Sequence, residues 1–152
     1  MERGQTFIDN SFIWGVDIIR SMTLNEQATR EVLAVIDEYV RYYNGKNQAK
    51  VLSLFSKNIS GFGTGKDEIV GNFAEFKERL GVDLNPANAI RIRMAVNAMG
   101  GEMPVAWVAG VCAFSGSMGG KRINIHGRMT AVLVNRGGRW SFEQVHFSAP
   151  DV

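Results

Sequence analysis

The spacing of hydrophobic residues changes once along the chain, near Asn85 and Pro86. Before this point apolar residues recur at intervals of three and four, which is typical of amphipathic helices. After it they alternate with polar residues, which is typical of β-strands with one buried face. A chain of 152 residues has the length of a single domain. We therefore expect an α+β fold, with about three N-terminal helices followed by an antiparallel sheet.

Three helices are expected in the first half of the chain. The longest spans Leu24–Asn44, where the apolar residues form one continuous stripe and Gly45 supplies a typical helix end. A short second helix is expected over Asn47–Phe55. A third is expected to begin at residue 66 or 67 and to run to Leu80, with Gly81 ending it.

The first 22 residues give a less clear pattern. Apolar residues such as Phe12 and Val16 fit either an extra amphipathic helix or an arm that packs on a partner. The expected division is therefore an N-terminal arm or extra helix at residues 1–22 and the main domain at residues 23–152.

Glycine pairs divide the second half into four expected strands. Gly-Gly at 100–101, 119–120 and 137–138 suits two-residue hairpin turns, whose positive φ angles favour glycine. The expected strands are Ala89–Met99, Val105–Met118, Lys121–Arg136 and Arg139–Ser148. An earlier short strand is expected at residues 59–65, where it runs into a glycine-rich turn.

Pairing the strands through the last two turns places the side chains on two faces of the sheet. The more apolar face should pack against the helices and enclose a pocket of small-molecule size. The expected pocket residues are Tyr39, Tyr43, Phe62, Cys112, Ala131, Trp140, Gln144 and His146. The mixed face should form a homodimer contact, because it is too apolar for open solvent and too polar for a core. The expected contact residues are Trp107, His126, Arg128, Thr130 and Glu143.

Composition excludes several classes of function. The net charge of +2 comes from 17 basic and 15 acidic residues without a run of Lys or Arg, so neither nucleic acid nor an acidic membrane is an expected partner. Cys112 is the only cysteine, which rules out an intrachain disulfide. The two histidines, His126 and His146, are expected on opposite faces, so no metal and no cofactor is expected. No signal peptide or membrane-spanning stretch is recognisable, and a cytoplasmic location is expected.

Three short motifs near the C-terminus resemble a known superfamily. They are Gly127-Arg128-Met129-Thr130, Gly138-Arg139-Trp140 and His146-Phe147-Ser148-Ala149-Pro150. They resemble the closing motif of SnoaL-like (ketosteroid-isomerase-like) domains in the nuclear transport factor 2-like superfamily, and that of the association domain of calcium/calmodulin-dependent kinase II. The turn at residues 63–68 is similar to that of a SnoaL-like subgroup found beside sensor kinases. The resemblance implies a cone-shaped curved antiparallel sheet packed on helices, the cystatin-like roll.

The resemblance also indicates what the pocket lacks. Ketosteroid isomerases of this fold use an Asp base after the second helix, with a Tyr and a protonated Asp as hydrogen-bond donors. The corresponding stretch here, residues 58–63, contains no carboxylate, and none lies on the apolar face of the expected sheet. Ala131 stands where the kinase association domain has a pocket Arg, and Gln144 replaces the first His of its terminal His-x-His. A ketosteroid-isomerase-type mechanism is therefore disfavoured.

If the pocket has a proton-transfer residue, His146 is the expected one, because no Asp or Glu is expected on the pocket face and histidine is a common acid–base catalyst. The alternative is a structural histidine, hydrogen-bonded to Ser148 or to a backbone carbonyl at the end of the last strand. The sequence Gly61-x-Gly63-x-Gly65-Lys66 lacks the spacing of a phosphate-binding loop and is expected to be a structural turn.

Three functions agree with this pattern. A non-catalytic small-molecule-binding domain, or a sensory version of it, is preferred because the expected pocket has no paired acid and base. An isomerase, cyclase or dehydratase that uses His146 with a Tyr of the first helix is the alternative. A pure oligomerisation module is the third.

Overall fold

The computed structural model describes residues 6–8, 11–13 and 24–150. A short antiparallel hairpin, β1 (Thr6–Ile8) and β2 (Ser11–Ile13), precedes the main body. The first half of the main body contains α2 (Glu26–Asn44), α3 (Gln48–Ser53), β3 (Phe55–Phe62), β4 (Ile69–Val70) and α4 (Phe73–Asp83). Four long strands follow, which are β5 (Ala89–Glu102), β6 (Val105–Met118), β7 (Lys121–Arg136) and β8 (Arg139–Ser148).

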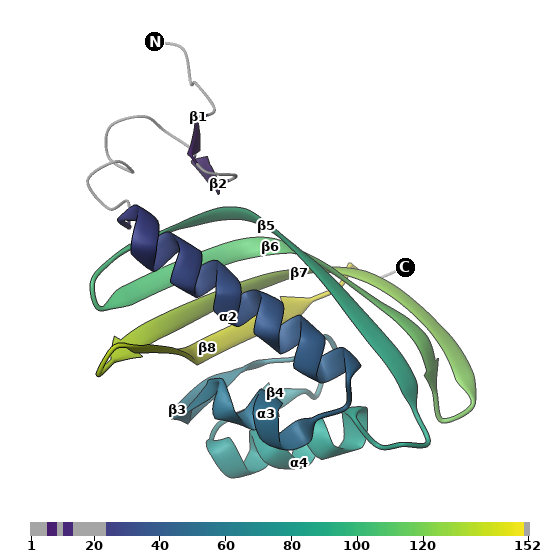
Figure 1. Cartoon of the computed structure of the whole chain (residues 1–152). Coiled ribbons are helices and arrows are strands. Elements are labelled where there is room, and N and C mark those ends of the chain that lie inside the picture. Colours follow the sequence, from purple (N-terminus) through teal and green to yellow (C-terminus); the bar gives the residue numbers. More distant parts are fainter. Residues whose placement is uncertain (1–5, 9–10, 14–23, 151–152) are drawn as a thin grey trace.

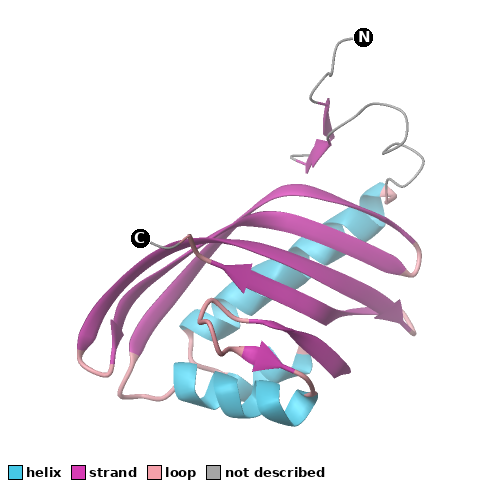
Figure 2. Cartoon of the chain, turned by 180° about the vertical axis from the view of Figure 1, so that it is seen from behind, coloured by secondary structure: helices cyan, strands magenta, loops and turns pink. Residues whose placement is uncertain are grey.

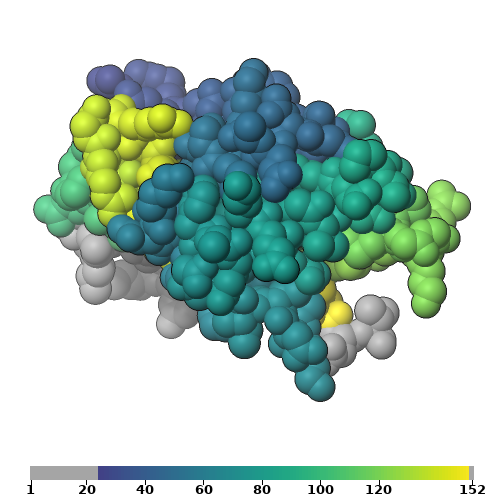
Figure 3. Space-filling view, turned by 90° about the horizontal axis from the view of Figure 1, so that it is seen from below, coloured from purple at the N-terminus to yellow at the C-terminus, as the bar shows by residue number. Residues whose placement is uncertain are grey.

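Six strands form one curved sheet in the order β4-β3-β8-β7-β6-β5. The strands β5 to β8 are an antiparallel meander, whereas β3 lies parallel to β8 and antiparallel to β4. The sheet bends around α2, which crosses its concave face (Figure 1). No helix of the described residues covers the convex face (Figure 2). The helices α3 and α4 lie side by side at one end of the molecule, and the β6–β7 hairpin protrudes beside them (Figure 3). This arrangement confirms the expected α+β roll.

The helix α2 forms the centre of the core. The Asn25 side chain accepts a hydrogen bond from the Ala28 backbone N–H and caps its first turn. Its buried residues lie four, four, three and four positions apart, on one side of the helix; they are Ala28, Val32, Ile36, Tyr39 and Tyr43. Ile92 of β5 and Leu133 of β7 are fully buried in the same core.

Hydrogen bonds hold both ends of α2 to the sheet. At the C-terminal end, the Asn44 amide donates to the Ile92 carbonyl oxygen at 2.9 Å, and the Ile92 N–H donates to the Asn44 amide oxygen at 2.8 Å. The side chain thus pairs with the outer edge of β5 as a neighbouring strand would. Nearer the N-terminal end, the Trp140 indole Nε1–H donates to a Glu31 carboxylate oxygen at 3.0 Å.

The first expected turn differs from the structure, whereas the other two are confirmed. Residues 119–120 and 137–138 turn the chain as expected, but β5 continues through Gly100 and Gly101 and the chain turns at residues 103–104. Both glycines are needed because β6 packs closely against them, and neither forms the turn. A Cβ at Gly100 would lie 2.8 Å from the Trp107 ring, and one at Gly101 would lie 2.3 Å from the Val105 carbonyl oxygen.

The third helix also begins and ends later than expected. The segment after residue 66 forms the turn into β4, and α4 begins at Phe73. Asn72 accepts a hydrogen bond from the Glu75 N–H at 2.9 Å, and the Glu75 carboxylate accepts one from the Gly71 N–H at 2.7 Å. This reciprocal capping fixes the start of the helix. The helix then passes Gly81 and ends at Asp83.

A β-bulge interrupts the pairing of β7 with β8. Leu133 pairs with Phe142, but Val132 pairs with Gln144, so Glu143 has no partner of its own in the ladder. An extra residue of this kind reverses the orientation of every side chain that follows it, because side chains alternate strictly along a strand.

The bulge corrects the expected orientation of the end of β8. Val145 and Phe147 face the concave side, and Val145 is buried. Gln144 and His146 face the convex side, where His146 is exposed and pairs with Thr130. The expectation that Gln144 and His146 face the pocket is therefore wrong. Residues 1–5, 9–10 and 14–22 of the expected arm or extra helix lie outside the described residues.

Replacing Asn44 by Ala should destabilise the protein by about 1–3 kcal/mol, because two partly buried hydrogen bonds to the edge of β5 are lost. Urea denaturation followed by circular dichroism measures this change. Asn97→Ala is the matched control, since Asn97 is an exposed residue of the same strand. A loss for Asn44→Ala no larger than that for the control would contradict the anchoring role.

Candidate functional site

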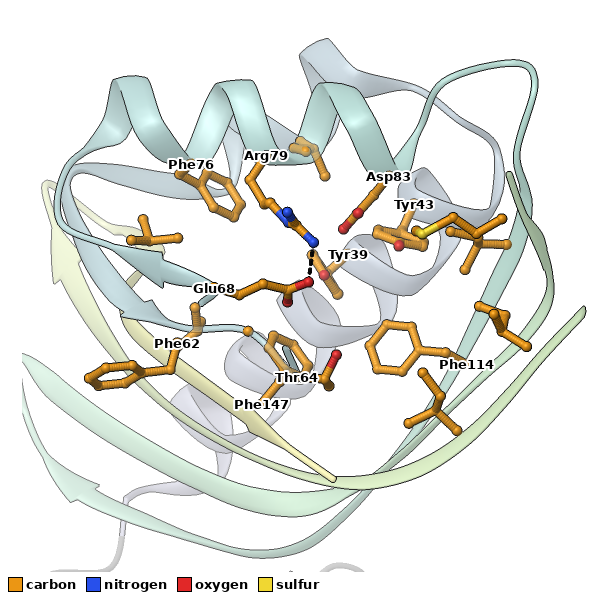
Figure 4. A pocket seen from close by; sticks show the side chains of 18 residues that line it. Tyr39, Tyr43, Phe62, Thr64, Glu68, Phe76, Arg79, Asp83, Phe114 and Phe147 are labelled. Carbon is orange, nitrogen blue, oxygen red and sulfur yellow. Dashed lines mark hydrogen bonds and ion pairs between the residues drawn. The ribbon is translucent and has the colours of Figure 1, made fainter. Parts of the chain in front are cut away.

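A pocket lies between the concave face of the sheet, α4 and the C-terminal half of α2. Its volume is about 170 Å³. Figure 4 shows side chains converging on it from α2, from α4, from the loop after β3 and from the sheet. The pocket exists because the sheet curves away from the end of α2, so that α4 closes the space between them.

Aromatic rings form much of the pocket wall. The Tyr43 ring lies 5.8 Å from Tyr39 and 6.5 Å from Phe114, and the Phe114 ring lies 6.0 Å from Phe147, measured between centroids. The pairs are tilted or edge-to-face, which are the favoured arrangements of aromatic rings. Phe76 of α4 adds another ring to the lining. The wall is therefore suited to a flat, apolar molecule.

Asp83, the last residue of α4, brings a carboxylate to one end of this pocket (Figure 4). Burial raises the pKa of the Asp83 carboxyl from 3.8 to about 6. Nearby charges act in both directions: Arg79 lowers this pKa, Glu68 raises it and Lys46 lowers it. A carboxyl group with a pKa of about 6 exists in both protonation states near neutral pH, as an acid–base catalyst requires.

Two tyrosines of α2 lie on the same side of the pocket as Asp83 (Figure 4). Burial raises the pKa of Tyr43, and the negative charges of Asp83 and Glu68 raise it further. Burial also raises the pKa of Tyr39, with smaller contributions from Tyr43 and Asp83. Both phenols are therefore neutral at physiological pH, and each hydroxyl can donate a hydrogen bond to an oxygen atom of a ligand.

An ion pair between Glu68 and Arg79 lies across the pocket from Phe114 (Figure 4). Arg79 projects from α4 and Glu68 from the glycine-rich turn that joins β3 to β4. A Cβ at Gly63 or Gly65 would come within 3 Å of the Glu68 side chain, so these glycines make room for that side chain. The turn therefore positions a carboxylate, which agrees with the structural turn expected from its spacing.

Only part of the expected pocket set lines the pocket. Tyr39, Tyr43 and Phe62 line it, although the Phe62 ring points outward and lies 5.4 Å from the His146 ring on the convex side. The other expected residues lie outside the lining; they are Cys112, Ala131, Trp140, Gln144 and His146.

The expected residues outside the lining are buried in the core or lie on the convex face. Cys112, Ala131 and Trp140 are buried in the core. Burial raises the pKa of the Cys112 thiol, which disfavours the reactive thiolate. His146 is exposed on the convex face, which removes it from the position that an acid or base of this pocket would need.

The charged residues of the pocket were missed by reasoning from the sequence; they are Glu68, Arg79 and Asp83. The expectation that no Asp or Glu reaches the pocket is wrong, because it considered the sheet alone and ended the third helix at Leu80. Phe76, Arg79 and Asp83 are spaced by three and four residues and share one side of α4. A helix start at Asn72-Phe73-Ala74-Glu75, which matches a capping pattern, would have placed Asp83 on that side.

The described residues contain no group of three or more His, Cys, Asp or Glu side chains arranged to hold a metal ion. Within the same residues, no helix is long and apolar enough to span a membrane. The pocket lining combines aromatic rings and aliphatic side chains with two phenols, the Thr64 hydroxyl, two carboxylates and one guanidinium.

The fold and the pocket together define an α+β roll that encloses a small-molecule site. Residues 32–152 match the family model of the SnoaL-like domain. The match covers most of the chain, and the chain belongs to this family. No curated protein matches the sequence.

Solved structures with the same fold have diverged far in sequence. An NTF2-like protein of unknown function from Pseudomonas putida is 13% identical, with a TM-score of 0.73 over 85% of this chain and 91% of that chain. A protein from Xanthomonas campestris assigned as a calcium/calmodulin-dependent protein kinase II association domain is 22% identical, with a TM-score of 0.68 over 90% and 100%. One from Shewanella frigidimarina assigned as a ketosteroid isomerase is 20% identical, with a TM-score of 0.64 over 76% and 92%. At these identities the likeness shows the fold alone.

The raised pKa of Asp83 predicts a specific dependence of stability on pH. A carboxyl group whose pKa is higher in the folded than in the unfolded protein disfavours the folded state when it ionises, so its effect appears as pH rises from about 4 to above 6. Asp83→Asn should therefore be more stable than the wild type by about 1–3 kcal/mol near pH 8 and equally stable near pH 4. Urea denaturation at a series of pH values measures the difference. Asp37→Asn, at an exposed position of α2, is the matched control. A difference for Asp83→Asn that does not change with pH would contradict the assignment.

Proposed function

We propose that this SnoaL-like domain binds a compact carbonyl compound in the pocket and catalyses proton transfer at the carbon beside the carbonyl group. The observation that supports the proposal is the Asp83 carboxyl, whose pKa of about 6 is set by burial in an aromatic pocket beside two neutral tyrosines. Enzymes of the isomerase or dehydratase type need a base of this strength together with a hydrogen-bond donor for the developing oxyanion.

The pocket has room for about one ring within its walls. Its volume of about 170 Å³ is close to the ~150 Å³ of an engineered apolar cavity that holds benzene. The apolar part of the ligand would contact Phe114, Phe147 and Phe76, and its oxygen would lie toward Asp83 and Tyr43.

The proton transfer assigns one role to each polar side chain. The Asp83 carboxylate accepts a proton from the α-carbon, and the electron pair of the broken C–H bond becomes the carbon–carbon double bond of an enolate. The carbonyl π pair moves to the oxygen, where the Tyr43 hydroxyl donates a hydrogen bond to the new negative charge. Where the ligand is a β,γ-unsaturated carbonyl, the enolate is a conjugated dienolate, and return of the proton from Asp83 to its γ-carbon moves the carbon–carbon double bond next to the carbonyl group and completes an isomerisation. In D₂O, the proton on Asp83 exchanges for a deuteron. Transfer of this deuteron back to the same carbon regenerates the ligand with one deuterium at the α-carbon.

This proposal replaces the preference for a non-catalytic domain and changes the residue of the catalytic alternative. That preference depended on the absence of an acid and a base in the pocket. Asp83 of α4 can serve as either one, because its carboxyl group is partly protonated near pH 6. The ion pair of Glu68 and Arg79 lines the same pocket.

Exchange of α-hydrogens in D₂O tests the chemistry without knowledge of the natural substrate. Cyclopentanone, cyclohexanone and acetophenone are incubated with the protein, and loss of the α-hydrogen signal is followed by proton NMR. We expect faster exchange with the wild type, and a rate that increases with pH through about 6 as Asp83 ionises. Asp83→Asn should lower the protein-dependent rate by about 10²–10⁴-fold.

Two further variants separate the roles. Tyr43→Phe should retain binding but slow the exchange, because the oxyanion loses one donor. His146→Gln should exchange at the wild-type rate, because His146 lies on the convex face. Normal exchange by Asp83→Asn, or loss of exchange in His146→Gln, would contradict the proposal. Ligand binding detected by NMR without any protein-dependent exchange would instead favour a binding domain.

A second candidate property is self-association through the convex face. Val105, Trp107 and Val111 are among the exposed large hydrophobic residues, and they lie on the outer face of β6 with Val132 of β7 beside Trp107. We call these four residues the apolar surface. We infer that two copies of the chain pair through it, with Thr130 at its margin, because contiguous apolar surface on a sheet face is typical of protein contacts.

Trp107→Glu should convert the dimer to a monomer, because a buried charge at the centre of the contact costs several kcal/mol. Multi-angle light scattering at micromolar concentration measures the mass. Val82→Glu is the matched control, since Val82 is an exposed apolar residue on α4 rather than on the sheet. A monomeric wild type would contradict the inference.

A further inference from the structure

The convex face carries a second feature that the apolar surface does not include. Arginines that are far apart in the sequence lie together at one end of this face, on β5 and β7. Five exposed basic or titratable residues form what we call the basic surface, namely Arg91, Arg93, Arg122, His126 and Arg128. The sequence predicted His126 and Arg128 on this face as part of a dimer contact, and the strand register adds Arg91, Arg93 and Arg122.

The strand register determines the arrangement of the basic surface. Ala113 of β6 pairs with Arg93 on one side and with His126 on the other. Ser115 pairs with Arg91 on one side and with Asn124 on the other. Side chains on one face repeat about every 6.8 Å along a strand, and two strand spacings are about 9.6 Å. Basic side chains of β5 and β7 therefore border a strip of short side chains on β6.

Few negative charges compensate this surface. Glu102 is the only acidic residue between positions 84 and 142, and it lies at the opposite end of β5 from Arg91. The ion pairs of the described residues join Arg30 to Glu26, Arg79 to Glu68 and Arg136 to Glu143, so none involves the basic surface. An anionic partner could therefore approach these arginines without displacing an acidic side chain of the described residues.

We propose that the basic surface binds an extended acidic segment of a partner protein. An extended peptide places alternate side chains about 6.8 Å apart on one side, which matches the repeat of Arg91 and Arg93 along β5. The short side chains of Ala113 and Ser115 allow the peptide backbone to approach β6 between the flanking basic residues. Acidic residues at alternate positions would then pair with arginines as charge-assisted hydrogen bonds.

Other polyanions fit this surface less well. Proteins that bind single-stranded nucleic acids stack bases on aromatic side chains, and the outward positions of the described strands here carry no Phe, Tyr or Trp between residues 89 and 95 or between 111 and 128. The interface with a peptide needs only charge, hydrogen-bond donors and a flat face, all of which are present. This inference is independent of the function proposed for the pocket, which lies on the other face of the sheet.

Fluorescence anisotropy with synthetic peptides tests the proposal. The probe is a labelled ten-residue peptide of alternating Glu and Ser, compared with alternating Lys and Ser. We expect the acidic peptide alone to bind the full chain, and to bind more weakly at about 150 mM than at about 50 mM NaCl. Charge reversal by Arg91→Glu with Arg93→Glu should weaken binding at least about tenfold.

The matched control carries the same change in net charge elsewhere. Lys66→Glu with Lys77→Glu reverses two exposed charges outside the basic surface, one in the β3–β4 turn and one on α4, and should leave the Kd within about twofold. Equal weakening in both double variants would overturn the proposal, because binding would then follow net charge alone. Tighter binding of an oligo-dT strand or of phosphatidylserine vesicles than of the peptide would also overturn it. So would a change in the mass of the Arg91→Glu, Arg93→Glu protein in light scattering, because the surface would then belong to the contact between two copies.

Discussion

The placement of α2 across the concave face is the constraint on which the rest of the molecule depends. The helix packs one stripe of side chains against the sheet, and Asn44 joins its last turn to the edge of β5 through both backbone groups of Ile92. An edge strand bound in this way cannot pair with another strand at that residue. With the C-terminal end of α2 fixed, Tyr39 and Tyr43 are held where the sheet curves away. The pocket is the space that remains between them and α4.

The pattern of the sequence predicted the elements of this fold better than the orientation of their last residues. The long helix, the four long strands and the turns at 119–120 and 137–138 follow from local periodicity and glycine placement, and these agree with the structure. The bulge at Glu143 does not follow from such rules, because an alternating segment with one extra residue has the same composition as one without it. Because of this one-residue shift, Val145 and Phe147 line the pocket where Gln144 and His146 were expected.

The candidate site was harder to predict, because Arg79 and Asp83 come from α4, a helix whose limits depend on capping. Gly81 is a common helix end, and a helix ending there excludes Asp83. In the structure Asn72 and Glu75 cap a start at Phe73, and the helix continues past Leu80 and Gly81 to Asp83. Tyr39 and Tyr43 were found from the sequence since they belong to a long helix whose buried side is unambiguous. Asp83, the carboxylate beside them, was not found in this way.

Asp83 and Glu143 lie on opposite sides of the sheet, and the pKa values of their carboxyl groups shift in opposite directions. Hydrogen bonds from Arg136 lower the pKa of Glu143 on the convex side, where water reaches both groups. Asp83 ends a helix on the concave side, where burial raises its pKa and where the negative end of the helix dipole also disfavours a second negative charge. An Asn at this position would have a similar size without the cost of ionisation. A buried carboxylate that lowers stability at neutral pH is typical of positions whose protonation is used in chemistry, and this is the physical reason to look for proton transfer at Asp83.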